Sequence, residues 1–183
     1  MIFQEVPEQT RSTANIIVRE VPLTRDRVRA LEDRLRTKLL PAVSALCRSG
    51  QNQAAYAYTI CGSIHLELRQ YREAKTAYTQ ADQLMPGSRA ILNGLLECAT
   101  ENGDLSAAKR AAKQITEFFP AEAGGWANLA MILGMTGESD EAIAAVDHAI
   151  ELAPADVTFR MIRDNCIMLR EISAPKKEKP QDN

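Results

Sequence analysis

Three prolines, Pro86, Pro120 and Pro154, follow one another at an interval of 34 residues, and each ends the same apolar pattern. Three consecutive copies fit this period without a gap, at residues 55–88, 89–122 and 123–156. A fixed repeat of this length is typical of a helical solenoid, in which each copy is a helix pair that packs against its neighbours. The repeat therefore predicts an all-α chain and argues against a closed catalytic domain.

Each copy contains two apolar stripes at helical spacing. In the first stripe, a bulky residue in the fourth place is followed three residues later by another apolar residue: Tyr58 and Cys61, Leu92 and Leu95, Trp126 and Leu129. In the second stripe, small residues recur: Ala74, Tyr78 and Ala81, then Ala108, Ala112 and Ile115, then Ala142, Val146 and Ala149. Alanine permits close helix crossings, and the proline that follows stops the helix.

A turn separates the two helices of each copy. Gly103-Asp104 and Gly137-Glu138 mark this turn in the second and third copies, because glycine readily ends a helix. The first copy has Arg69-Gln70 in the same place, so its turn is less well specified.

These residues resemble the tetratricopeptide repeat (TPR), whose pattern runs Trp, Leu-Gly, Tyr, Ala, Phe, Ala, Pro over 34 residues. The resemblance covers residues 55–156; the first and third copies match well, and the second clearly keeps Leu95, Ala108 and Pro120. It implies a right-handed helical-hairpin solenoid of three repeats that binds other polypeptides.

Helices are also expected on both sides of the repeats. Residues 1–23 include two apolar stretches, Ile16-Ile17-Val18 and Val21-Pro22-Leu23, and are interpreted as an extended arm. Residues 24–50 predict a helix from about Thr24 to Lys38, after which Pro41 either kinks the helix or starts a second segment. Residues 157–172 predict a capping helix that buries Phe159, Ile162 and Leu169, and residues 173–183 a disordered tail.

Charge and hydropathy exclude several classes of partner. Residues 51–156 carry seven Lys/Arg against fourteen Asp/Glu, and this acidic balance disfavours nucleic acid. No apolar run approaches the length of a membrane span, and the N-terminus lacks the pattern of a secretory signal. A cytoplasmic protein is therefore expected.

Few residues suggest chemistry. The two histidines, His65 and His148, are interpreted as a packing or groove-edge residue and an outward-facing residue. The four cysteines form no metal-ligand spacing and are interpreted as small hydrophobic residues in a reducing compartment. We expect no catalytic residue, no metal site and no cofactor.

The resemblance also implies a concave groove lined by the first helix of each repeat. Its register gives Tyr56, Thr59, Ile60, Ser63, Leu66 and Glu67 in the first repeat; Ala90, Asn93, Gly94, Glu97, Thr100 and Glu101 in the second; Gly124, Ala127, Asn128, Met131, Gly134 and Met135 in the third; and Met161, Asn165 and Met168 in the capping helix. No Lys or Arg is among the repeat positions, which argues against the clamp by which some relatives bind acidic chaperone tails.

Flexible methionines with a few asparagines and glutamates suit an apolar, neutral or basic segment of another protein. The first interpretation is thus a non-catalytic adaptor or chaperone, similar in plan to the bacterial type III secretion chaperones. The alternative is an assembly subunit that self-associates through its repeats and arm, with a homodimer through residues 1–50. The sequence leaves open whether the arm occupies the groove.

Overall fold

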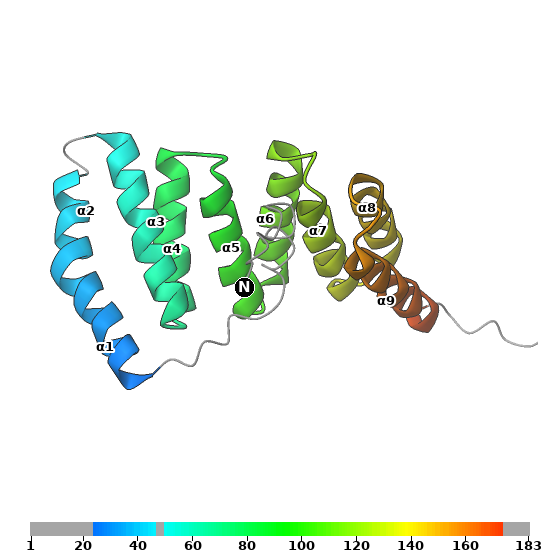
Figure 1. Ribbon diagram of the computed structural model, residues 1–183, viewed down its shortest axis with the longest axis horizontal. Helices are drawn as coiled ribbons and strands as arrows, with labels where there is room; N and C mark the ends of the chain where they lie inside the picture. Colours follow the sequence, from blue (N-terminus) through cyan, green and yellow to red (C-terminus); the bar gives the residue numbers. More distant parts are fainter. Residues whose placement is uncertain (1–23, 47–49, 174–183) are drawn as a thin grey trace, which may run out of the picture. The chain divides into compact units, whose positions relative to one another are not determined.

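The computed structural model describes residues 24–46 and 50–173, and the described residues outside the turns are helical (Figure 1). The helices are α1 (Arg25–Arg34), a π-helical turn (Leu35–Leu39), α2 (Leu40–Leu46), α3 (Gln51–Glu67), α4 (Tyr71–Leu84), α5 (Arg89–Glu101), α6 (Leu105–Phe118), α7 (Ala123–Met135), α8 (Ser139–Leu152) and α9 (Val157–Ser173). The predicted all-helical class is confirmed. The predicted arm, most of the predicted tail, and Cys47 lie outside the described residues.

The chain divides into two compact units at the turn between α5 and α6. In the first unit, α3 packs on α4, α4 on α5, and α2 on α3. In the second unit, α6 packs on α7, α7 on α8, and α9 on both α7 and α8. Each unit therefore has helix pairs of its own.

The same turn closes the first helix of all three repeats. Arg69, Gly103 and Gly137 have φ values of 57°, 69° and 83°. Each of the three donates its N–H to the carbonyl three residues back, and the next residue donates to the carbonyl five residues back. This is the glycine-type helix end predicted for the second and third copies, and the first copy forms it with an arginine.

The helix before the repeats is longer than predicted. It continues past Lys38 as far as Leu46, through the π-helical turn. Pro41 has no N–H to donate to Thr37, and the N–H of Leu40 bonds the Leu35 carbonyl, five residues back. The wider π-helical turn thus accommodates the proline in a continuous helix.

The core of the first unit is organised around one aromatic ring. Tyr78 of α4 is 4% exposed, and its ring lies against two glycines, Gly62 of α3 and Gly94 of α5. A Cβ atom at Gly62 would lie 2.8 Å from the ring, and one at Gly94 only 2.3 Å from its Cζ atom. The ring therefore takes the space that side chains at both positions would need.

The second unit ends with α9 as its cap. Phe159 is fully buried and Cys166 nearly so, while Arg163 Nε lies 2.5 Å from Asp147 Oδ1 and Arg170 Nη1 lies 3.4 Å from Asp140 Oδ1, both on α8. The expected burial of Leu169 was wrong, because this side chain is 38% exposed. Only part of the apolar half of α9 is used to dock the helix.

Candidate functional site

On α3, several of the predicted groove residues already make contacts within the first unit. Thr59 Oγ1 donates to the Ala55 carbonyl and Ser63 Oγ to the Ile60 carbonyl, at 2.8 and 2.9 Å. Leu66 is half-buried against the Tyr78 cluster. Tyr56 is open to solvent, with 68% of its surface exposed.

Glu67, a predicted groove residue, has an ion-pair partner within the chain. Its Oε2 atom lies 3.2 Å from Arg27 Nη2 of α1, the helix that precedes the repeats. The repeat pattern could not predict this ion pair, because it joins residues 40 positions apart, one of which precedes the repeats. Glu67 therefore ties α1 to the first repeat.

On α5, two of the predicted groove residues are exposed carboxylates. Glu97 and Glu101 are exposed and Asn93 is half-buried, but Gly94 is buried beneath Tyr78 and offers no open surface. Burial and then a hydrogen bond to Glu101 raise the pKa of Tyr71, so this carboxylate is already in contact with the protein. Gly94 is corrected from a groove position to a packing position.

Burial and a neighbouring carboxylate also affect the thiol of Cys98, a buried residue of α5. Burial, and secondarily the charge of Glu97, raise the pKa of Cys98 to about 12. Burial likewise raises the pKa of Cys61 and of Cys166. These three thiols are buried and stay protonated at neutral pH, as expected of small hydrophobic residues.

On α7 and α9, four of the predicted positions carry exposed apolar side chains. Met131 and Met135 of α7 are 40% and 57% exposed, and Met161 and Met168 of α9 are 64% and 52% exposed. Leu169 and Ile172 were not among the predicted site residues but are also exposed, and Asn128 is half-buried. Ala127 and Gly134, also in the predicted register, are buried. We call Met131, Met135, Met161, Met168, Leu169 and Ile172 the methionine face.

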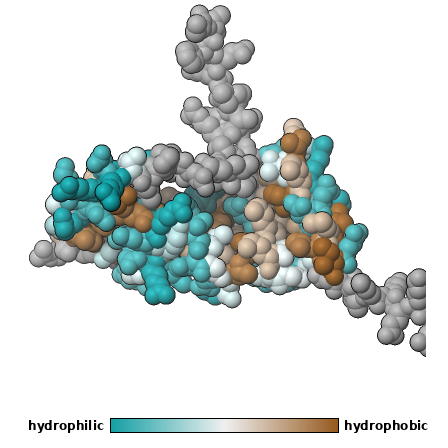
Figure 2. Space-filling model, turned by 90° about the horizontal axis from the view of Figure 1, so that it is seen from below, coloured by the Kyte–Doolittle hydropathy of each residue, from teal (hydrophilic) through white to brown (hydrophobic). Residues whose placement is uncertain are grey.

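Figure 2 shows apolar surface over the end of the chain formed by α7–α9, at the right of the view. Six large apolar side chains within one unit exceed the scattered exposure that is normal on a protein surface. The methionine face is thus the strongest candidate for a binding surface among the described residues.

The exposed side of α9 has two different halves. Met161, Met168 and Ile172 lie within one arc of the helix, whereas Arg160, Asp164 and Glu171 lie in the adjoining arc. The charged arc stays in water at little cost. Exposing the apolar arc to water costs free energy, so a contact that covers it is favourable.

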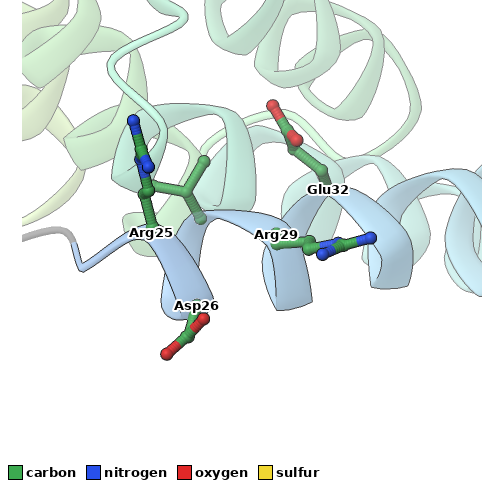
Figure 3. Close-up of a pocket in the computed structure, with 5 residues that line it drawn as sticks. Arg25, Asp26, Arg29 and Glu32 are labelled. Carbon is green, nitrogen blue, oxygen red and sulfur yellow. The ribbon is translucent and has the colours of Figure 1, made fainter.

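A shallow depression on α1 is a weaker candidate. It is lined by Arg25, Asp26, Val28, Arg29 and Glu32, all from one exposed helix. Figure 3 shows that Arg25 and Asp26 point in opposite directions and that Arg29 extends along the helix. Their charged groups do not converge on a common point, so they form no binding centre.

The histidines take part in packing. His65 Nδ1 lies 2.7 Å from Gln70 Oε1 across the first turn. His148 was predicted to face outward, but its ring lies edge-on to Trp126 with centroids 4.4 Å apart, and Glu151 lies 3.4 Å from its Nδ1 atom. Within residues 24–46 and 50–173, no three His, Cys, Asp or Glu side chains gather as a metal site would require. Neither histidine is assigned a catalytic role.

Comparison with known proteins identifies the repeat pattern. A family model described as tetratricopeptide repeat matches residues 65–132, and a second model with the same description matches residues 123–156. No curated protein matches the sequence. None of the described helices is long and apolar enough to cross a membrane.

Several solved structures share the fold. The TPR domain of Sgt2 from Aspergillus fumigatus aligns with a TM-score of 0.59 and 18% identity, over 70% of this chain and 87% of that domain. The OM64 TPR domain from Arabidopsis aligns with a TM-score of 0.58 and 17% identity, over 67% and 98%. The protein MamA aligns with a TM-score of 0.58 and 15% identity, over 76% and 89%. At these identities, the similarity establishes the fold alone.

Proposed function

Because this chain belongs to the tetratricopeptide repeat family, we propose that it is a non-catalytic adaptor that holds an apolar segment of a partner protein on its methionine face. The exposure of this face is the observation that carries the proposal. Methionine side chains are flexible and polarizable, so they adapt to apolar side chains of different shapes. The family fold supports protein partners in general.

Covering the methionine face contributes favourable free energy to a complex. Covering six large side chains that are roughly half exposed contributes on the order of 5–10 kcal/mol before the entropic cost of association. Of the predicted polar site residues, Asn128 lies on α7 and is half-buried. We therefore infer that apolar contacts dominate binding on the second unit.

The first unit offers a different surface on α3 and α5, the first helices of the first two repeats. Tyr56, Glu97 and Glu101 are exposed, and Asn93 is half-buried. An exposed aromatic ring and exposed carboxylates suit a neutral or basic stretch of a partner. We propose that these residues add contacts of that kind.

The proposal is tested by affinity capture of partners from the native host, comparing the intact chain with a Met131→Glu/Met135→Glu variant. Two carboxylates on the methionine face would have to be desolvated on binding, so the variant is expected to lose the partner. An Ala144→Glu/Ala155→Glu variant is the matched control, because it adds the same charge at exposed positions outside α7 and α9. Circular dichroism and Trp126 fluorescence check that both variants fold.

Loss of a partner from the first variant alone would support the adaptor and name its pathway. The same partners captured by all three proteins would contradict it. Recovery of this protein alone would instead favour an assembly subunit that self-associates.

The chaperone role is a narrower form of the same proposal. A protein that covers an apolar segment of its partner also keeps that partner soluble, which is the plan of the type III secretion chaperones. A cytoplasmic location fits this role. Both are tested by the identity of the captured partner.

A further inference from the structure

The repeat register shows what covers equivalent positions elsewhere in the chain. Gly134 of α7 lies beneath α9, since a Cβ atom there would be 3.6 Å from Leu169 Cδ1 and 3.7 Å from Cys166 Sγ. Ala127, about two helical turns before Gly134 on α7, is fully buried. The residues 34 positions later are Met161 and Met168 of α9, and both are exposed. The surface of α9 that corresponds to the part of α7 covered by α9 is thus exposed.

This open place has the form of a helix-binding stripe. Val157, Met161, Met168 and Ile172 are exposed and follow one another at intervals of four, seven and four residues. At about 1.5 Å per residue, the stripe runs about 22 Å along the helix. Intervals of this kind let two helices pack along their length.

The adjoining arc of α9 limits the occupant to one helix. In α7, the fourth, eighth and eleventh positions of the repeat are Trp126, Ala130 and Leu133, on the helix that packs against α8. The same positions in α9 are Arg160, Asp164 and Ile167. Exposed charges at two of these positions disfavour the second helix of a further hairpin, because they would have to be desolvated.

The stripe also lacks polar partners for an extended peptide. An extended chain brings one N–H and one C=O per residue that need partners when covered. The stripe itself is apolar, and Asn165 is the amide beside it on α9. A helix bonds its own backbone groups internally, so it can cover an apolar stripe without leaving them unpaired.

We propose that α9 binds a single amphipathic helix of the partner protein, which lies along Val157, Met161, Met168 and Ile172 as α9 lies along α7. This inference rests on the proposed adaptor function and names the kind of segment that the adaptor takes. Residues 123–172 contain eight Asp/Glu against three Arg, so the polar side of the bound helix is basic.

Three labelled peptides test the proposal by fluorescence anisotropy against the full chain. The first is an Ala, Lys and Gln peptide with leucines at intervals of three, four and three residues, the spacing of Phe159, Ile162, Cys166 and Leu169 in α9. The second has the same sequence except that two central residues are replaced by proline, which prevents a helix. The third is residues 10–23 of this chain, part of the segment that the sequence predicts to be an extended arm.

The first peptide is expected to bind at least tenfold more tightly than the other two. A Met161→Glu/Met168→Glu variant is expected to lose this binding by at least tenfold. Since the variant is more acidic, a purely electrostatic attraction to the lysines would become stronger instead. The variant thus separates apolar docking from charge.

Equal or tighter binding of the proline peptide or of residues 10–23 would overturn the helix inference and leave the adaptor function standing. Failure of all three peptides, with a captured partner still lost from the Met131→Glu/Met135→Glu variant, would do the same. A partner retained by that variant would instead contradict the adaptor function itself.

Discussion

At the residue scale, Tyr78 and its two glycines determine how closely the first three repeat helices approach. The ring of Tyr78 contacts both Gly62 and Gly94, which lie on different helices. Neither glycine is needed for a turn, since both lie within helices, where glycine is unfavourable by about 1 kcal/mol relative to alanine. Their role is to leave room for the ring.

Gly94→Ala is therefore expected to destabilise the protein by about 1–3 kcal/mol, because the new methyl group overlaps the Tyr78 ring. Gly124→Ala, also within a helix, is the matched control, because a Cβ atom there meets nothing within 4 Å. This control is expected to be neutral or stabilising by up to about 1 kcal/mol. Urea unfolding measures both.

Tyr78→Leu provides the second check on this contact. The smaller side chain leaves space at Gly94, so Gly94→Ala is expected to cost less in the Tyr78→Leu background than alone. Strictly additive effects, or a Gly94→Ala protein as stable as Gly124→Ala, would contradict the packing role.

Arg69 adopts a backbone conformation that is unfavourable for a residue with a side chain. Its φ of 57° is the left-handed conformation that glycine adopts at the same place in the other two repeats. Arg69→Gly is expected to stabilise the protein by about 0.5–1 kcal/mol, since the strain of a side chain there exceeds the entropic cost of glycine. Gly103→Ala, which introduces the strain, is expected to lower the midpoint of thermal unfolding. A lower midpoint for Arg69→Gly would show that the arginine makes a compensating contact.

At the element scale, ion pairs between consecutive hairpins repeat with the period of the chain. Lys75 on α4 pairs with Asp104 at 3.1 Å, and Lys109 on α6 pairs with Glu138, each pair 29 residues apart. The next pair in the register would be Ile143 and Ile172, both apolar. The change from charged to apolar at this position coincides with the methionine face of α9.

The Lys109–Glu138 pair predicts a dependence of stability on pH. Hydrogen bonds from Lys109 and Thr136 lower the pKa of Glu138. The folded state therefore binds this proton less readily than the unfolded state, and the contribution is present at neutral pH and lost as pH falls through the lowered pKa. Glu138→Gln is expected to remove it, so the stability difference between wild type and variant shrinks in acid.

Chemical unfolding from neutral pH down to the acidic range measures this difference. Glu141→Gln, which removes an exposed carboxylate from the first turn of α8, directly after Glu138, controls for the loss of one negative charge. A wild-type advantage over Glu138→Gln that stays constant with pH would contradict the assignment.

The comparison of sequence and structure also belongs at this scale. Periodicity predicted the repeat helices and the glycine turns, because these depend on residues close in sequence. It also indicated Met131, Met135, Met161 and Met168, which are exposed. It did not predict the Glu67–Arg27 pair or the burial of Gly94 under Tyr78, because both depend on contacts between different helices. Pro41 was ambiguous, since a π-helical turn has no sequence pattern of its own.

At the scale of the whole molecule, the last helix has two roles that can be separated. Its inner side buries Phe159 and Cys166, and its outer side carries the stripe proposed to bind a helix. Removing the helix is therefore expected to affect stability, whereas changing its outer side is expected to affect binding alone.

Ending the chain at Asp156 is therefore expected to destabilise the second unit by several kcal/mol, since a buried phenylalanine alone contributes about 3–5 kcal/mol. Trp126, the single tryptophan of the chain, lies in this unit and reports its unfolding by fluorescence. A chain that ends at Ser173 is the control and is expected to unfold like the full chain. Met161→Glu/Met168→Glu is expected to match the control, because both side chains are already exposed to solvent. An Asp156 truncation that unfolds at the same midpoint as the full chain would show that α7 and α8 do not need α9 as a cap.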